Sequence, residues 1–192
     1  MQETAKAREL RKKLGHFDKY LNGKGIDIGA GPDLLQIDHG IVEPFDMPHG
    51  DANFLDSVQD ETYDFSYSSH CLEHMLSLRT SFFNWTRILK PGGFLYTVVP
   101  DYELYEKCVW PPQFNKDHKQ TFSMKLKRDT VGRLNHWHIH EDIVPLLNKL
   151  GLDFVEASIQ DDGHDYTWPP SIDQTSASNA MCQICFVFQK RK

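Results

Sequence analysis

The sequence lacks the features that mark exported, membrane-spanning or disulfide-stapled proteins. It has four cysteines in 192 residues, and no stretch approaches the roughly 18 apolar residues that a membrane helix needs. Residues 1–13 are polar and contain no apolar core of the kind found in signal peptides. We therefore expect a cytoplasmic protein with reduced cysteines and no association with a membrane.

The sequence also lacks the cationic excess of a protein that binds the phosphate backbone. Lys and Arg number 21 against 27 Asp and Glu, so the formal net charge is -6. Because nucleic-acid binding normally relies on clustered Lys and Arg, a nucleic-acid partner is not expected. Nothing in the composition indicates an oligomeric state.

The regular alternation of apolar segments predicts an α/β domain. The length suits one domain over residues 1–192, with its own hydrophobic core. Strands and helices that alternate along a chain favour a doubly wound, mostly parallel sheet with ligands at the carboxyl ends of its strands. We expect strands at residues 26–28, 35–39, 63–68, 94–99, 152–159 and 181–188, and helices at residues 3–21 (within an N-terminal segment 1–22), 77–89 and 141–150.

Two long segments do not fit this alternation. Residues 101–140 are rich in aromatic side chains and histidine, and residues 161–179 are rich in Asp, Ser and Pro. Long insertions in a compact domain are usually functional, so we predict that residues 101–140 form a substrate lid.

A glycine-rich turn after the first expected strand is the main ligand-binding signal. A short strand that contains one acidic residue leads into Gly-x-Gly in the run Gly25-Ile26-Asp27-Ile28-Gly29-Ala30-Gly31-Pro32-Asp33. Glycines have no side chain, so a nucleotide-like ligand can approach the backbone of this turn. Pro32 and Asp33 stand where a dinucleotide-binding turn would continue toward its third glycine. The turn therefore favours a ligand without a diphosphate over a nicotinamide dinucleotide.

Five segments in order resemble the class I S-adenosylmethionine-dependent methyltransferases. The similarity is to the small enzymes with a Gly-x-Gly-Pro turn and a Leu-Glu-His signature, the methyltransferase type 11-like group. The matching segments are residues 26–32, 37–38, 50–52, 63–74 and 89–94. The resemblance implies a Rossmann-like, seven-stranded sheet with an antiparallel last strand, S-adenosylmethionine as cofactor, and a methyl acceptor that is a small molecule or sugar-like compound, attacked at O or N.

The same resemblance assigns roles to residues. Asp27 would face the ammonium group of the cofactor, Asp38 would bind the ribose hydroxyls, and Asp51 with Ala52 would meet the adenine. Gly29, Ala30 and Gly31 would lie along the methionine part, and Ser69 and His70 would border the methyl group.

The spacing between Gly31 and Asp38 is short for a crossover with a helix, which needs about ten to twelve residues. Either the first crossover is a loop without a helix, or the second strand lies later and Glu43 or Asp46 binds the ribose. We favour the loop, because Asp38 followed by residues 50–52 keeps the order of the family.

Histidines are the candidate catalytic residues. A general base is needed only where the acceptor must lose a proton, and histidine has a pKa near working pH. We consider His70, His118, His138 and His140.

Histidine patterns also raise a metal alternative. His70-x-x-Glu73-His74 reads as an inverted zinc-protease motif, and His136, His138 and His140 alternate as on a strand. We expect no metal, because the first pattern lies where the methyltransferase group carries a similar sequence. The rival functions are a zinc hydrolase, a nicotinamide-dependent oxidoreductase, and a non-catalytic or nucleotide-binding relative.

Overall fold

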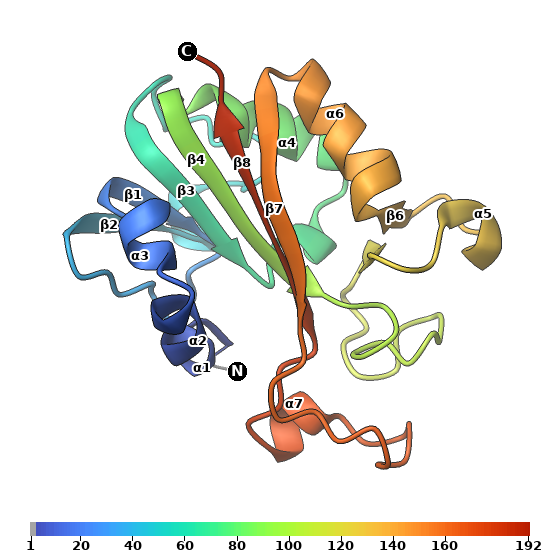
Figure 1. Cartoon of the computed structure of the whole chain (residues 1–192). Helices are drawn as coiled ribbons and strands as arrows, with labels where there is room; N and C mark the ends of the chain where they lie inside the picture. The colour runs from blue at the N-terminus through green and yellow to red at the C-terminus, as the bar shows by residue number, and fades with distance from the viewer. Residues whose placement is uncertain (1–2) are drawn as a thin grey trace.

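A six-stranded sheet forms the central layer of the computed structural model, which describes residues 3–192 (Figure 1). Its strand order is β2-β1-β3-β4-β8-β7, with β1, β2, β3 and β4 parallel and β8 antiparallel to both of its neighbours. The strands are β1 (Gly23–Ile28), β2 (Gly40–Phe45), β3 (Tyr63–Ser69), β4 (Leu89–Pro100), β7 (Leu152–Gln160) and β8 (Gln183–Lys190). The predicted mostly parallel α/β sheet with an antiparallel last strand is confirmed.

The sheet has one strand fewer than the seven expected. After β2 the chain passes through the short 3-10 helix η1 (Met47–His49) and then through turns to β3 without adding a strand. Strand β2 is therefore the edge of the sheet, where Pro44 is tolerated because one side of the backbone needs no hydrogen-bonding partner.

The predicted second strand at residues 35–39 is wrong. Those residues have no regular structure, and the strand lies at Gly40–Phe45. The Leu35 N–H donates to the buried carboxylate of Asp27 at 2.8 Å, and the Leu35 side chain packs into the core. This contact closes the loop after the glycine turn, so pairing with β1 starts only at Gly40.

The N-terminal segment forms three short helices instead of one. They are α1 (Glu3–Lys6), α2 (Arg8–Lys13) and α3 (His16–Lys19), and Met1 and Gln2 lie outside the described residues. Gly15 separates α2 from α3 in a left-handed conformation with φ of 70°, which glycine adopts without strain. Phe17 and Leu21 pack against β3 and β4 and cover one face of the sheet.

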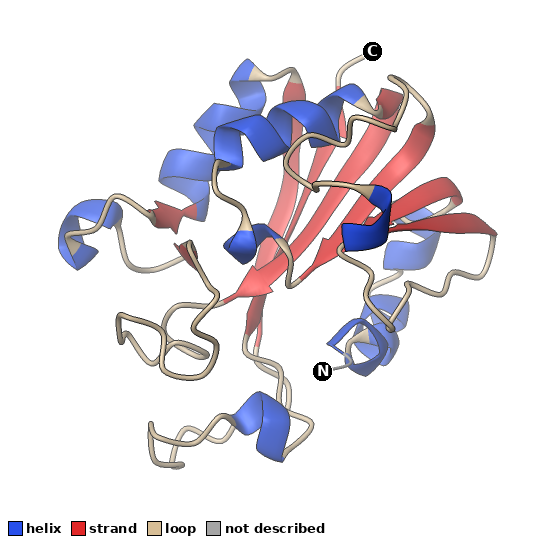
Figure 2. Ribbon diagram, turned by 180° about the vertical axis from the view of Figure 1, so that it is seen from behind, coloured by secondary structure: helices blue, strands red, loops and turns tan. Residues whose placement is uncertain are grey.

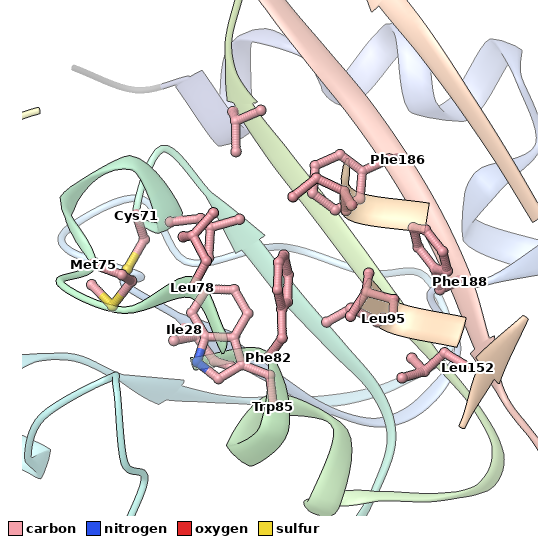
Figure 3. Close-up of a cluster of buried hydrophobic side chains, with 14 of the residues drawn as sticks. Ile28, Cys71, Met75, Leu78, Phe82, Trp85, Leu95, Leu152, Phe186 and Phe188 are labelled. Atoms are coloured by element: carbon pink, nitrogen blue, oxygen red, sulfur yellow. The ribbon is translucent and has the colours of Figure 1, made fainter. Parts of the chain in front are cut away.

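The opposite face carries the larger part of the core (Figures 2 and 3). Helix α4 (Leu78–Arg87) begins at Ser77, whose hydroxyl accepts from the Thr80 N–H, and lays Phe82 and Trp85 on the sheet. Trp85 also donates its indole N–H to the Ala52 carbonyl at 2.8 Å. The expected helix at residues 141–150 is a π-helical turn, η3 (Ile139–Ile143), that continues into α6 (Val144–Lys149).

The two irregular segments lie beyond the ends of the sheet (Figure 1). Residues 101–140 begin as a loop and then form the strands β5 (Thr121–Ser123) and β6 (His136–His138), which pair in parallel, with α5 (Arg128–Val131) between them. Residues 161–179 contain α7 (Gln174–Ala177). Among residues 3–192, no helix combines the length and the apolar character needed to cross a bilayer.

Candidate active site

The carboxyl ends of β1 and β3 lie side by side where the strand order of the sheet reverses. Strand β2 lies on one side of β1 and strand β3 on the other, which makes this a topological switch point. Ligands of open α/β sheets bind in the crevice at such a point. Gly29 follows β1 here, and on the other side Ser69 ends β3 and His70 follows it.

The glycine turn has the backbone that glycine permits. Gly29 has φ of 81° and Gly31 has φ of 50°, and a Cβ added to Gly29 would lie 2.5 Å from the Cys71 Cβ. Below the turn, the side chain of Asp27 is only 1% exposed, and burial raises its pKa to about 7 although the Leu35 hydrogen bond and Arg11 oppose the rise. Asp27 thus supports the turn from inside the protein.

Two cavities adjoin at Gly29, His70 and His74. The first, here called the β2-side cavity, has a volume of about 300 Å³, and the second, the loop-side cavity, about 230 Å³. The β2-side cavity is also lined by Asp46, Met47, Gly50, Ala52, Cys71 and Met75. The loop-side cavity is also lined by Ala30, Gly31, Ser69, Glu73, Tyr105 and His118, among others.

Asp46, and not Asp38, stands at the carboxyl end of β2. Its Oδ2 accepts the Gly31 N–H at 2.9 Å, which ties β2 to the glycine turn. Asp38 lies in the loop before the first residue of β2 and pairs with Arg8 at 3.0 Å. The second strand lies at residues 40–45 instead of the predicted 35–39. The acidic residue at its carboxyl end is therefore Asp46 instead of Asp38.

Asp51 acts as a turn residue. Its Oδ1 accepts both the backbone and the side-chain N–H groups of Asn53 at 2.8 Å, and it lines neither cavity. Its neighbour Ala52 does line the β2-side cavity.

The four candidate histidines separate into two pairs. His70 borders both cavities, and His118 lines the loop-side cavity. His138 is buried elsewhere: its Nδ1 accepts the Glu141 N–H at the start of the π-helical turn, and its Nε2 donates to the Met124 carbonyl. His140 is exposed and packs on Phe154. The structure therefore brings His70 and His118, but not His138 or His140, to the glycine turn.

Two buried glutamates lie beside His118: Glu73, which the sequence analysis considered only in the metal alternative, and Glu106, which it missed. Glu73 and Glu106 are each 1% exposed, and His118 lies between them with its Nδ1 2.5 Å from Glu106 Oε1. Burial lowers the pKa of His118, but the two carboxylates outweigh burial and leave that pKa raised. The Leu-Glu-His sequence pointed to Glu73, whereas no local pattern distinguishes Glu106.

A larger hollow of about 700 Å³ lies between the N-terminal helices and residues 175–179. Its one carboxylate and one ammonium group, on Glu3 and Lys6, pair with each other at 2.9 Å. It lacks the glycine turn and the histidines, so the two smaller cavities are the better candidate site.

Residues 19–97, from α3 through most of β4, match the family described as a methyltransferase domain. Over these residues, which make up less than half of the chain, the sequence is similar to methyltransferase domains. The matched residues include the glycine turn, Asp46 and the turn after β3. None of the curated proteins compared with the sequence matches it.

Solved structures share the fold of this chain. A S-adenosylmethionine-dependent methyltransferase from Archaeoglobus fulgidus is 14% identical with a TM-score of 0.54, covering 99% of this chain and 95% of that one. A chain from a complex between the Haloferax volcanii Trm112 methyltransferase activator and a protein described as a methyltransferase is 14% identical, with a TM-score of 0.60 and coverage of 97% and 94%. A protein described as a sarcosine dimethylglycine methyltransferase from Galdieria sulphuraria is 15% identical, with a TM-score of 0.55 and coverage of 95% and 83%. At these identities the likeness concerns the fold.

Proposed function

We propose that the chain transfers the methyl group of S-adenosylmethionine to an oxygen or nitrogen atom of a small-molecule or sugar-like acceptor. The observation that carries the proposal is the position of the glycine turn between two cavities of different character. The β2-side cavity has an acidic residue and two methionines, and the loop-side cavity has polar and titratable side chains. The first suits a nucleoside and the second suits an acceptor.

The residues of the β2-side cavity fit the nucleoside part of the cofactor. A Cβ added to Gly31 would meet no atom nearer than 4.0 Å, so open space borders the turn. The Asp46 carboxylate would accept hydrogen bonds from the ribose hydroxyls. Met47, Ala52 and Met75 would contact the adenine, and Gly29 and Gly31 would lie against the methionine part.

Bound S-adenosylmethionine supplies an activated methyl carbon: the acceptor atom bonds to it while the carbon–sulfur bond breaks and leaves its electron pair on sulfur. The protein's main task is to position the acceptor for this in-line displacement. Ser69 and His70 would border the methyl group from the end of β3. For a hydroxyl acceptor, His70 is our candidate base because it borders both cavities.

Calorimetry with S-adenosylmethionine and S-adenosylhomocysteine tests this assignment. We expect Asp46→Asn to weaken binding by about 10-fold to 100-fold, because a hydrogen bond to a charged group contributes about 1.5–3 kcal/mol. Asp38→Asn is the matched control, since it removes a carboxylate that pairs with Arg8 and lines neither cavity. Absence of binding by the wild type at millimolar ligand, or equal binding by Asp46→Asn, would refute the proposal.

The acceptor is identified by transfer from isotopically labelled S-adenosylmethionine to pools of hydroxylated and aminated small molecules, read by mass spectrometry. Label on small molecules is expected. Label found only on added protein or nucleic acid would contradict the proposed acceptor class while leaving the cofactor assignment intact.

A further inference from the structure

A carboxylate and two imidazoles converge on the wall of the loop-side cavity. Glu73 and His74 lie in the 3-10 helix η2 (Leu72–His74), and His118 comes from the loop of residues 101–120. One ligand atom from each of the three lies within 4.8 Å of the others. The Glu73 Oε1 is 3.9 Å from His74 Nε2 and 3.8 Å from His118 Nε2.

The Glu73 carboxylate has no partner that explains its burial. It is 1% exposed, and neither of its oxygens accepts a hydrogen bond from any of residues 3–192. Its ion-pair neighbours among these residues are His70, His74 and His118. A buried charge is costly unless an opposite charge and direct ligands compensate it, so a cation bound at this point would stabilise the carboxylate.

The hydrogen bonds of the two histidines turn the Nε2 atom of each ring toward Glu73. The Nδ1 of His118 faces a Glu106 oxygen at 2.5 Å, and the Nδ1 of His74 faces the Asp117 carbonyl at 3.3 Å. A carboxylate and a carbonyl only accept, so each Nδ1 carries a proton and Nε2 is the ring nitrogen that faces Glu73. Histidines that ligate metals have this arrangement, with the second nitrogen donating to a carboxylate or carbonyl.

The distances favour a metal ion over a proton or an ammonium group. At 3.8 and 3.9 Å, a proton on either Nε2 would not form a hydrogen bond with Glu73. Two acceptors that share an ammonium nitrogen at about 2.8 Å lie about 4.6 Å apart. Two atoms that share a tetrahedral metal ion at about 2.1 Å lie about 3.4 Å apart, which the observed spacing approaches more closely.

We propose that Glu73, His74 and His118 bind a divalent transition-metal ion, with Glu106 as the residue that orients His118. Two imidazoles and one carboxylate suit Zn²⁺, Fe²⁺, Co²⁺ or Mn²⁺. Three protein ligands leave coordination positions open to the cavity, as in catalytic metal sites. This site departs from our expectation that the protein holds no metal.

The site also narrows the methyl acceptor, a step that rests on the proposed methyl transfer. A metal ion on this wall would lie in the cavity that borders Gly31 and Ser69. An acceptor hydroxyl in an open coordination position would have a lowered pKa, which favours attack through oxygen over attack through nitrogen.

Cobalt titration of the chelator-treated, full-length protein tests the site. We expect one Co²⁺ per chain, seen as visible d–d absorption that Zn²⁺ displaces. Glu73→Gln and His118→Ala should weaken Co²⁺ binding by roughly 100-fold or more, and Glu106→Gln by roughly 10-fold to 100-fold without a change in stoichiometry. His140→Ala is the matched control, because it removes an exposed imidazole outside both cavities.

Thermal unfolding guards against a variant that simply fails to fold. Zn²⁺ should raise the midpoint of the wild type and of His140→Ala but leave that of Glu73→Gln unchanged. No Co²⁺ binding by the wild type, or equal binding by Glu73→Gln, would overturn the metal site. Binding of S-adenosylhomocysteine by the same samples separates the two proposals. Cofactor binding without metal binding would refute only the metal site. Metal binding without cofactor binding would refute only the proposed methyl transfer.

Discussion

The buried carboxylate of Asp27 makes the stability of this protein depend on pH. Its pKa is raised from the ordinary value of 3.8 to about 7, chiefly because burial disfavours the charged form. Between about pH 4 and pH 7 the folded chain holds a proton on this group that the unfolded chain has released. The free energy of unfolding therefore falls as pH rises through this window, and the full penalty is present above the folded pKa.

Replacing Asp27 with asparagine removes this penalty. The asparagine carbonyl can still accept the Leu35 N–H that Asp27 accepts at 2.8 Å. A pKa of about 7 against 3.8 corresponds to at most about 4 kcal/mol. The stability of Asp27→Asn relative to wild type should thus increase by up to that amount between pH 4 and pH 8, on top of any constant difference.

Urea unfolding at several pH values measures the effect. The same substitution at the exposed Asp51 controls for the general loss of one negative charge. The reasoning is refuted if the stability difference between Asp27→Asn and wild type is the same at pH 4.5 and pH 8.

Further predictions concern packing and the residues that the structure removes from the site. Phe82→Ala should lower the free energy of unfolding by about 3–5 kcal/mol, because it empties the fully buried position under α4; a loss below about 1 kcal/mol in urea would contradict the packing. His138→Ala should cost about 1 kcal/mol through loss of its capping bond to Glu141 while leaving S-adenosylhomocysteine affinity unchanged; a weaker affinity by calorimetry would return His138 to the site. Gly29→Ala should destabilise the protein through contact with Cys71, and Cys71→Gly should restore part of the loss in thermal unfolding; no restoration would place the strain elsewhere.

Local sequence patterns determined the fold class and the centre of the site. Alternating apolar segments indicate an α/β sheet because burial of each element depends on its own periodicity. The glycine turn was visible because positive φ and close approach to a ligand both require missing side chains. The resemblance to methyltransferases implied that Ser69 and His70 lie beside Gly29 and Gly31, and in the structure all four line the loop-side cavity.

Only the tertiary structure decided the register and the long-range contacts. The choice between Asp38 and Asp46 depended on where β2 begins, and the contact between Asp27 and Leu35 delays that start to Gly40. The convergence of Glu73 with His118 joins residues 45 positions apart, and Glu106 becomes relevant only because the loop of residues 101–120 folds over the turn after β3. The periodicity of the sequence does not predict these long-range contacts, because they depend on how separate elements pack against one another. The sequence alone therefore identifies the class of ligand, and the packed chain identifies which carboxylates meet it.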